Sequence, residues 1–103
     1  MSTTIGGYNF DDPYTSTDKL EDMSGIYAVL CCRDKICNII DVGESASVRS
    51  RIENHDRKDC WEKNCSDTLK FSVYYTTNLR ESGRKKIERE IRDQYSSIPC
   101  GEL

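Results

Sequence analysis

The sequence lacks long hydrophobic runs, internal repeats and low-complexity tracts. None of its apolar stretches approaches the roughly 18 residues that a membrane-spanning helix requires. The first residues, MSTTIGGYNFDDPY, have neither a basic start nor an apolar middle, so they do not resemble a secretory signal. Hydrophobic residues make up 36% of the chain and charged residues 32%. This composition predicts a soluble globular protein that stays in the cytoplasm and does not contact a membrane.

A length of 103 residues leaves room for one hydrophobic core and therefore for one folded domain. We expect this domain to span residues 25–103. Residues 1–24 are polar and acidic, which predicts an irregular N-terminal arm. The arm is expected to pack loosely on the domain through its aromatic side chains, Tyr8, Phe10 and Tyr14.

Six cysteines occur in the sequence, and the expected compartment decides how they are interpreted. In a reducing cytoplasm, thiols stay unpaired and act as small buried hydrophobic side chains. We therefore expect all six cysteines to be reduced and structural. A zinc site built from His55, Cys60 and Cys65 is the alternative, but its spacing is looser than that of structural zinc sites and a fourth ligand is not evident.

A strongly basic charge balance is also missing, because the formal net charge is −3. At first sight this argues against a nucleic-acid partner. The arm, however, carries five acidic residues against one lysine, a net charge of −4, which leaves +1 for residues 25–103. The domain is thus close to neutral and its basic residues cluster, so the local charge decides which partner it can bind.

Runs of apolar and β-branched residues predict strands. Residues 26–32 form the first run, RDK supplies a turn, and ICNIIDV resumes the pattern until Gly43 ends it. These two runs predict a β-hairpin. Both faces of its first strand carry apolar side chains, so we expect the sheet to be covered on both sides. A third strand is expected in LKFSVYYTTN, where alternate residues share one face: Leu69, Phe71, Val73 and Tyr75.

Helical patterns follow the hairpin and the third strand. Ser45 is predicted to cap a helix that runs to about Arg57, with an inward stripe of Val48, Ile52 and His55. DCWEKNC predicts a short second helix anchored by Trp61. ESGRKKIEREIRDQY predicts a final helix whose apolar stripe is Ile87, Ile91 and Tyr95. The predicted fold class is α/β of the mixed α+β kind, a small sheet flanked by helices.

Two charged residues lie at the borders of the helical stripes, Arg51 on the first helix and Glu88 on the last. Such residues are usually solvated flanks. Here both helices adjoin one small sheet, and Tyr27 lies near the start of its first strand. A carboxylate can hold a hard divalent cation, and a guanidinium can neutralise charge on a phosphate. A phenol close to positive charge can activate water, so the trio suits phosphodiester hydrolysis.

Basic residues also open the final helix. Arg84, Lys85 and Lys86 fall in its first turns, where the helix dipole disfavours positive charge. This placement is explained if that end of the helix faces a polyanion. The alternative explanation is a solvated basic face that nearby carboxylates balance, namely those of Glu81, Glu88 and Glu90.

Several motifs in order resemble the GIY-YIG nuclease domain, and the resemblance covers most of residues 24–102. GIY stands at residues 25–27, and DVG follows at residues 41–43 in the place of the second tripeptide. DVGESASVRSRIENH resembles the family's stretch from the second tripeptide into the first helix. RKKIEREIRDQYSSIPCG resembles the family's closing helix and the proline after it.

This resemblance implies a three-stranded antiparallel sheet with flanking helices and a reaction that cuts DNA with Mg²⁺ or Mn²⁺. Glu88 would hold the metal, Tyr27 would act as or assist the general base, and Arg51 would stabilise the pentacovalent phosphorus. His55 falls on a histidine often found one turn after the arginine, where it contacts phosphate or closes the edge of the core. The products would carry a 5′-phosphate and a 3′-hydroxyl.

The remaining site residues are two glycines and a set of basic residues. Gly25 opens the first tripeptide, and Gly43 would keep the strand-to-helix turn close to the active site, because a Cβ there would crowd it. We expect the DNA to contact the basic residues of the two helices, namely Arg49, Arg57, Lys58, Arg84, Lys85 and Lys86.

One residue departs from the family pattern, because the second tripeptide normally begins with tyrosine and this chain has Asp41. In a hairpin, Asp41 can still neighbour Tyr27. Three roles are open to it: a second metal contact, a hydrogen bond to Tyr27, or the mark of a site that has lost activity. We favour an altered but working site, since Tyr27, Arg51 and Glu88 are all present, and we keep Asp41 among the catalytic candidates.

The sequence therefore predicts a stand-alone, metal-dependent DNA endonuclease in repair, recombination, or phage or mobile-element DNA processing. A homodimer or a partner protein would supply specificity, because no specificity domain is evident. Two other classes stay open. One is a catalytically impaired nucleic-acid-binding module with the same fold, which Asp41 favours, and the other is a protein-interaction domain that does not bind DNA.

Overall fold

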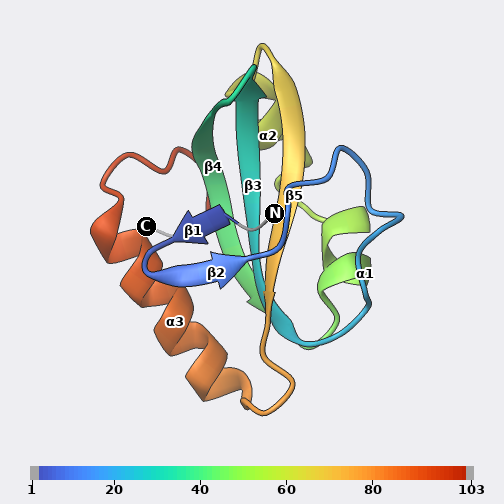
Figure 1. The fold of residues 1–103 in the computed structure, drawn as a ribbon, viewed down its shortest axis with the longest axis vertical. Helices are drawn as coiled ribbons and strands as arrows, with labels where there is room; N and C mark the ends of the chain where they lie inside the picture. Colours follow the sequence, from blue (N-terminus) through green and yellow to red (C-terminus); the bar gives the residue numbers. More distant parts are fainter. Residues whose placement is uncertain (1–2, 102–103) are drawn as a thin grey trace.

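A three-stranded antiparallel sheet forms the centre of the molecule (Figure 1). The computed structural model of the chain describes residues 3–101, so the first two residues of the predicted arm and the last two of the predicted domain lie outside the described residues. The strands are β3 (Gly25–Arg33), β4 (Ile36–Ser45) and β5 (Thr68–Tyr75), in the spatial order β4–β3–β5. The predicted hairpin, third strand and mixed α+β class are confirmed.

The β3–β4 hairpin is longer than predicted and contains an irregularity. Ser45 still pairs with Gly25, so β4 does not end at Gly43. Val29 pairs with Asp41 and the next residue of β3 pairs with Ile39, which leaves Ile40 as an extra residue in β4. Such a bulge bends a strand and re-aims the residues beside it. Asp41 consequently shares the face of the sheet on which Val29 lies.

The first helix is shorter than predicted. Helix α1 spans Val48–Glu53 and begins after Ser47, because the Ser45 hydroxyl accepts the N–H of Ser47 and does not cap a helix. The chain leaves helical geometry at Asn54, so His55 lies in a loop beyond the helix.

The other two helices follow the prediction closely. Helix α2 spans Lys58–Lys63 and buries Trp61 to 2% exposure. Helix α3 spans Glu81–Gln94, and its two isoleucines, Ile87 and Ile91, are buried. The third member of the predicted stripe is exposed, because Tyr95 lies just past the end of α3.

The prediction of a loosely packed, irregular arm is wrong for residues 3–10. Strands β1 (Thr3–Ile5) and β2 (Tyr8–Phe10) form a small antiparallel hairpin that crosses one face of the central sheet (Figure 1). Phe10 is completely buried, and Leu20 further along the segment is 2% exposed. The N-terminal segment is therefore an integral part of the core.

Two hydrophobic clusters cover the two faces of the sheet, as the two-sided pattern of β3 predicts. One face packs against β1, β2 and α3, and Ile26 and Ile91 lie in its cluster. The other face packs against α1 and α2, and its cluster contains Tyr27, Ile52 and Trp61. Because side chains alternate along a strand, Tyr27 points to the α1–α2 side while its neighbour Ile26 points to the α3 side.

The cysteines contradict the prediction of reduced thiols. All six form disulfides: Cys31–Cys65, Cys32–Cys37 and Cys60–Cys100. The Cys32–Cys37 bridge joins directly paired residues of β3 and β4. Zinc ligation by Cys60 and Cys65 is excluded in this state, because both sulfurs are already bonded. The error came from inferring the redox state from the expected compartment.

None of the helices within residues 3–101 has the length and apolar character needed to span a bilayer.

Candidate active site

A cavity of about 680 Å³ opens between the sheet, α1 and α3. Tyr27 from β3, Arg51 from α1 and Glu88 from α3 all line it. These three side chains come from three separate elements, far apart in the sequence. The structure therefore brings together the trio that the sequence singled out for phosphodiester chemistry.

Strand register determines how Tyr27 enters this cavity. Tyr27 pairs directly with Gly43 of β4, so both residues face the same side of the sheet. A Cβ at position 43 would overlap the hydroxyl and ring carbons of Tyr27. The glycine thus makes room for the phenol inside the strand, and not at a strand-to-helix turn as predicted. Gly25 is also required, since a Cβ there would meet the backbone oxygen of Tyr74.

His55 is the hydrogen-bond partner of Tyr27. The Tyr27 hydroxyl lies 2.5 Å from Nε2 of His55, and both residues are buried. The other ring nitrogen, Nδ1, accepts the backbone N–H of Arg57 at 3.0 Å. In a neutral imidazole only one nitrogen carries a proton, so this bonding pattern assigns the proton to Nε2. His55 therefore donates its N–H to the oxygen of Tyr27.

A carboxylate oxygen of Asp56 also lies near Nδ1, at 3.4 Å. That contact would require a protonated Nδ1. We assign the acceptor role to Nδ1 because the backbone N–H of Arg57 is closer, while the Asp56 side chain is 74% exposed and bonds Arg51 at 3.1 Å.

Burial controls the protonation of the Tyr27–His55 pair. Burial, with the negative charge of Asp41, raises the pKa of Tyr27 to about 12, although the charges of Arg57 and Arg51 oppose this shift. Burial, with the charges of Arg57 and Arg51, lowers the pKa of His55 to about 4. At neutral pH the tyrosine is therefore a phenol and the histidine is uncharged. The expected effect of nearby positive charge on Tyr27 is present, but burial outweighs it.

Glu88 lies on α3 with its side chain 20% exposed. Its Oε2 accepts Nε of Arg92 at 3.2 Å, one turn further along the helix. Burial raises the pKa of Glu88, and the charge of Glu44 adds to this, while the bond and charge of Arg92 lower it. A bound cation would offset the same burial penalty.

The donor set around Glu88 fits a magnesium ion only in part. Within residues 3–101, no group of three or more His, Cys, Asp and Glu side chains is arranged to hold a metal. Mg²⁺, however, is commonly held by one or two carboxylates and completes its shell with water and substrate phosphate. Glu88, with Oε1 free of the Arg92 bond, matches that pattern, and the described residues form no metal cage made of protein alone.

The Asp41 side chain makes contacts that the sequence did not suggest. It is fully buried, and its two oxygens accept hydrogen bonds from Arg57, Trp61 and Arg92 at 2.8 to 3.2 Å. Tyr27 bonds His55 and not Asp41. Both carboxylate oxygens are thus occupied by nitrogen donors, which argues against a metal contact. Asp41 and Tyr27 remain diagonal neighbours on one face of the hairpin.

The predicted DNA contacts differ in their availability. Lys85 and Arg57 line the cavity, and Lys86 and Lys58 are exposed. Arg84 is buried and bonds Glu44 and the carbonyl of Leu79, so it does not contact DNA in this arrangement.

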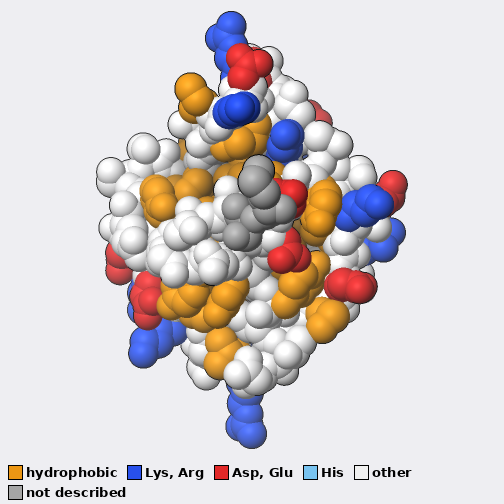
Figure 2. Space-filling view, in the orientation of Figure 1, with side chains coloured by type: hydrophobic (Ala, Val, Ile, Leu, Met, Phe, Trp, Pro, Cys, Tyr) orange, Lys and Arg blue, Asp and Glu red, His pale blue; other side chains and the backbone are white. Residues whose placement is uncertain are grey.

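Arg49 pairs with Glu53 on the outer side of α1. Lys and Arg side chains lie mostly toward the margins of the face that carries β1 and β2, and acidic side chains lie near its middle among hydrophobic and uncharged atoms (Figure 2). That face is therefore less suited to a DNA backbone than the cavity is.

Sequence reasoning missed four residues that line the cavity: Glu44, Arg89, Arg92 and Asp93. Arg92 had a usable signal, because it stands four residues after Glu88 in a predicted helix, where opposite charges pair. Glu44 had no such signal in the sequence, because its salt-bridge partner Arg84 belongs to a helix that is distant in the sequence.

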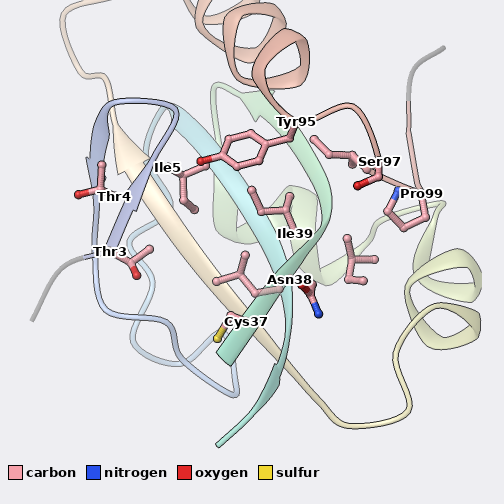
Figure 3. A pocket seen from close by; sticks show the side chains of 12 residues that line it. Thr3, Thr4, Ile5, Cys37, Asn38, Ile39, Tyr95, Ser97 and Pro99 are labelled. Carbon is pink, nitrogen blue, oxygen red and sulfur yellow. The ribbon is translucent and has the colours of Figure 1, made fainter. Parts of the chain in front are cut away.

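A second cavity, of about 460 Å³, lies between β1, the start of β4 and the segment after α3 (Figure 3). Thr3, Asn38, Ile39, Ser97 and Pro99 are among the residues that line it, and none of its lining residues within the described chain is charged. The described residues of its lining offer neither a carboxylate for a metal nor a cation for a phosphate. We therefore place the candidate site in the first cavity.

Comparisons with protein-family models, with curated proteins and with solved structures found no match. The resemblance to the GIY-YIG nuclease domain accordingly depends on the motifs in the sequence.

Proposed function

We propose that the protein is a metal-dependent DNA endonuclease with a GIY-YIG-like site, which leaves a 5′-phosphate and a 3′-hydroxyl. One observation carries the proposal: Tyr27, Arg51 and Glu88 line a single cavity although they come from three separate elements. A phenol, a guanidinium and a half-buried carboxylate around one space can act on one phosphate.

Tyr27 is the proposed general base. Its phenolate takes a proton from the attacking water, and the resulting hydroxide forms a bond to phosphorus while the bond to the 3′-oxygen breaks. The departing 3′-oxygen takes a proton from solvent water and becomes the 3′-hydroxyl. His55 supports this role because its Nε2–H donates to the tyrosine oxygen and stabilises the phenolate. Arg51 neutralises the charge that grows on the non-bridging oxygens.

Glu88 is the proposed metal ligand. A bound Mg²⁺ or Mn²⁺ would polarise the phosphate and stabilise the leaving oxygen. Arg92 bonds one oxygen of Glu88, which lines the cavity, so the other oxygen is the proposed metal contact. Exposed Lys58 and Lys86, with Lys85 and Arg57 at the cavity, are the proposed contacts to the DNA backbone. A homodimer or a partner protein remains our proposal for the source of specificity.

A nucleic-acid-binding module without cleavage is the second candidate. Two observations favour it: Asp41 replaces the tyrosine of the second tripeptide, and Arg92 already occupies one oxygen of Glu88. Such a module would still bind DNA through the same basic residues, with an affinity that falls as salt rises.

Incubation of the purified protein with supercoiled plasmid and Mg²⁺ or Mn²⁺ separates these candidates. An endonuclease nicks the plasmid, and EDTA or Arg51→Ala abolishes the nicking. Arg49→Ala is the matched control, because Arg49 lies on the same helix but pairs with Glu53 outside the cavity. If neither metal yields nicking on duplex, branched or single-stranded DNA while gel shifts persist, the binding module is correct. If there is no gel shift either, both candidates fail.

The expected cytoplasmic location stays a prediction. The three disulfides weigh against it, because thiols in reducing compartments are normally kept unpaired.

A further inference from the structure

The Asp41 carboxylate is the most completely bonded charged group at the site. Arg57 donates to it twice, from Nε at 2.8 Å and from Nη2 at 3.2 Å. Trp61 donates its indole N–H at 2.8 Å, and Arg92 donates from Nη2 at 2.9 Å. The carboxylate is fully buried, so these four bonds replace its hydration. One side chain of β4 thereby fixes residues at the start of α2, inside α2 and on α3.

Arg57 is held by this carboxylate in a defined orientation. Two N–H groups of its guanidinium bond the two oxygens of Asp41, a fork that fixes the plane of the group. A guanidinium has five N–H groups, so three remain for another partner. The Arg57 side chain is 29% exposed and lines the cavity with Tyr27 and Arg51. Its free N–H groups are therefore available to an anion in the cavity.

The backbone of Arg57 makes a second contact at the site, with His55. Its N–H donates to Nδ1 of His55, which keeps the proton of His55 on Nε2 and directs it to Tyr27. A displacement of Arg57 would release Nδ1, and the exposed Asp56 carboxylate at 3.4 Å would then favour a proton on that nitrogen. With the proton on Nδ1, His55 could no longer donate to Tyr27.

Arg92 donates to the same carboxylate, at the oxygen that also accepts Nη2 of Arg57. Its remaining bonds go to Glu88 and to the carbonyls of Val42 and Cys100. Four of its five N–H groups are thus used within the protein, so Arg92 has little capacity left for a ligand. Arg57 and Arg92 therefore have different functions although both contact Asp41.

We infer that Asp41 is a positioning residue, which through Arg57 presents a second guanidinium to the phosphate beside Arg51 and keeps His55 as a donor to Tyr27. This inference deepens the proposed nuclease function and rests on it for the reaction, but the positioning itself does not require cleavage. Asp41 is then neither a metal ligand nor the mark of a lost site. It replaces the tyrosine of the second tripeptide with a different supporting arrangement.

The histidine tautomer tests the positioning directly, because His55 is the only histidine in the chain. Nitrogen-15 NMR of the imidazole should show the proton on Nε2 in the wild type at neutral pH. Asp41→Asn should shift a measurable population to the Nδ1–H form, whereas the control Asp56→Asn should retain the wild-type pattern. A folded Asp41→Asn protein with an unchanged tautomer would overturn the inference, whether or not the wild type cuts DNA.

A double-mutant cycle tests the link to Arg57. Asp41→Asn and Arg57→Lys should each lower the single-turnover kcat about 10- to 100-fold, the range typical of supporting residues, with a smaller change in KM. The double variant should be no slower than the slower single variant, because both changes disable one unit. Multiplicative losses, or an unchanged kcat in folded Asp41→Asn, would overturn the inference. A wild type that cuts no DNA refutes the proposed function instead, and the tautomer then decides the positioning alone.

Discussion

The hydroxyl of Tyr27 lies 2.5 Å from Nε2 of His55, and the imidazole is the donor in this bond. The direction of the bond matters for the proposed chemistry. A histidine that accepts a proton from tyrosine would be the base itself, whereas a histidine that donates stabilises the phenolate of Tyr27. The low pKa of His55, about 4 because of its burial and the nearby arginines, agrees with the second arrangement.

The first prediction concerns pH. Because burial raises the pKa of Tyr27 to about 12, only a small fraction of the free protein carries a phenolate near neutrality. That fraction rises tenfold per pH unit below the pKa. We therefore expect kcat/KM for plasmid cleavage to rise about tenfold per unit between roughly pH 6 and 9, with no plateau. Tyr27→Phe should abolish the activity, and a plateau starting near pH 7 would exclude Tyr27 as the free base.

The second prediction concerns His55. NMR titration of the single imidazole should give a midpoint near 4, so the ring stays neutral above about pH 5. The folded protein then binds fewer protons than the unfolded chain between pH 4 and the ordinary value of 6.5. Stability from this group is complete above 6.5 and is lost as the pH falls toward 4.

Chemical denaturation of His55→Gln across this pH range is the control. The variant should lose part of the acid-dependent decrease in unfolding free energy. A His55 midpoint of 6 or higher would contradict the burial argument.

The third prediction uses two glycines. Gly43→Ala should place a methyl group into the phenol of Tyr27, which must then move. We expect a loss of about 1–3 kcal/mol in unfolding free energy and a cleavage rate reduced at least tenfold. Gly83→Ala is the matched control: its Cβ would meet Leu79 at an ordinary 3.5 Å, inside α3. Alanine there should stabilise the helix by up to about 1 kcal/mol and leave cleavage unchanged.

Equal effects of the two glycine substitutions on the cleavage rate would show that the space opposite Tyr27 has no catalytic importance. Circular dichroism melts and single-turnover assays on both variants supply the comparison.

The fourth prediction concerns the disulfides. Cys60–Cys100 spans a sequence separation of 40, and the carbonyl of Cys100 accepts a bond from Arg92 beside Asp41. Replacing both cysteines by alanine should cost about 4 kcal/mol by the chain-entropy model and lower the cleavage rate. The pair Cys32–Cys37 has a sequence separation of only 5, so its removal should cost about 2 kcal/mol and leave the cleavage rate unchanged.

Denaturant titration under non-reducing conditions measures both double variants, and a thiol count on the folded wild type should find no free cysteine. Six titratable thiols in the native wild type would contradict the disulfide pairing.

Local sequence patterns correctly predicted the strands and helices whose apolar residues recur at a regular spacing. The β3–β4 hairpin and β5 could be predicted from the sequence because their apolar residues alternate. Helix α3 could be predicted because Ile87 and Ile91 recur one turn apart. Tyr27, Arg51 and Glu88 could be selected because residues of suitable chemistry lay at the edges of these elements.

The predictions that were wrong concern residues whose structure depends on contacts with residues distant in the sequence. Phe10 is buried only because the β1–β2 hairpin lies across the sheet, a tertiary contact that the polar composition of residues 1–24 hides. The role of Asp41 depends on Arg57, Trp61 and Arg92, which meet it only in the folded chain. The redox state of the cysteines depends on which residues the fold brings together, and the pairs are up to 40 positions apart.

The single-turnover rate of plasmid nicking by Glu88→Gln, compared with wild type at saturating Mg²⁺, tests the central claim most directly. Glu62→Gln on the exposed side of α2 is the control for a lost carboxylate. The account predicts that the wild type and Glu62→Gln nick at similar rates, and that Glu88→Gln is slower by about 100-fold or more while still folded. Equal nicking by wild type and Glu88→Gln would contradict it.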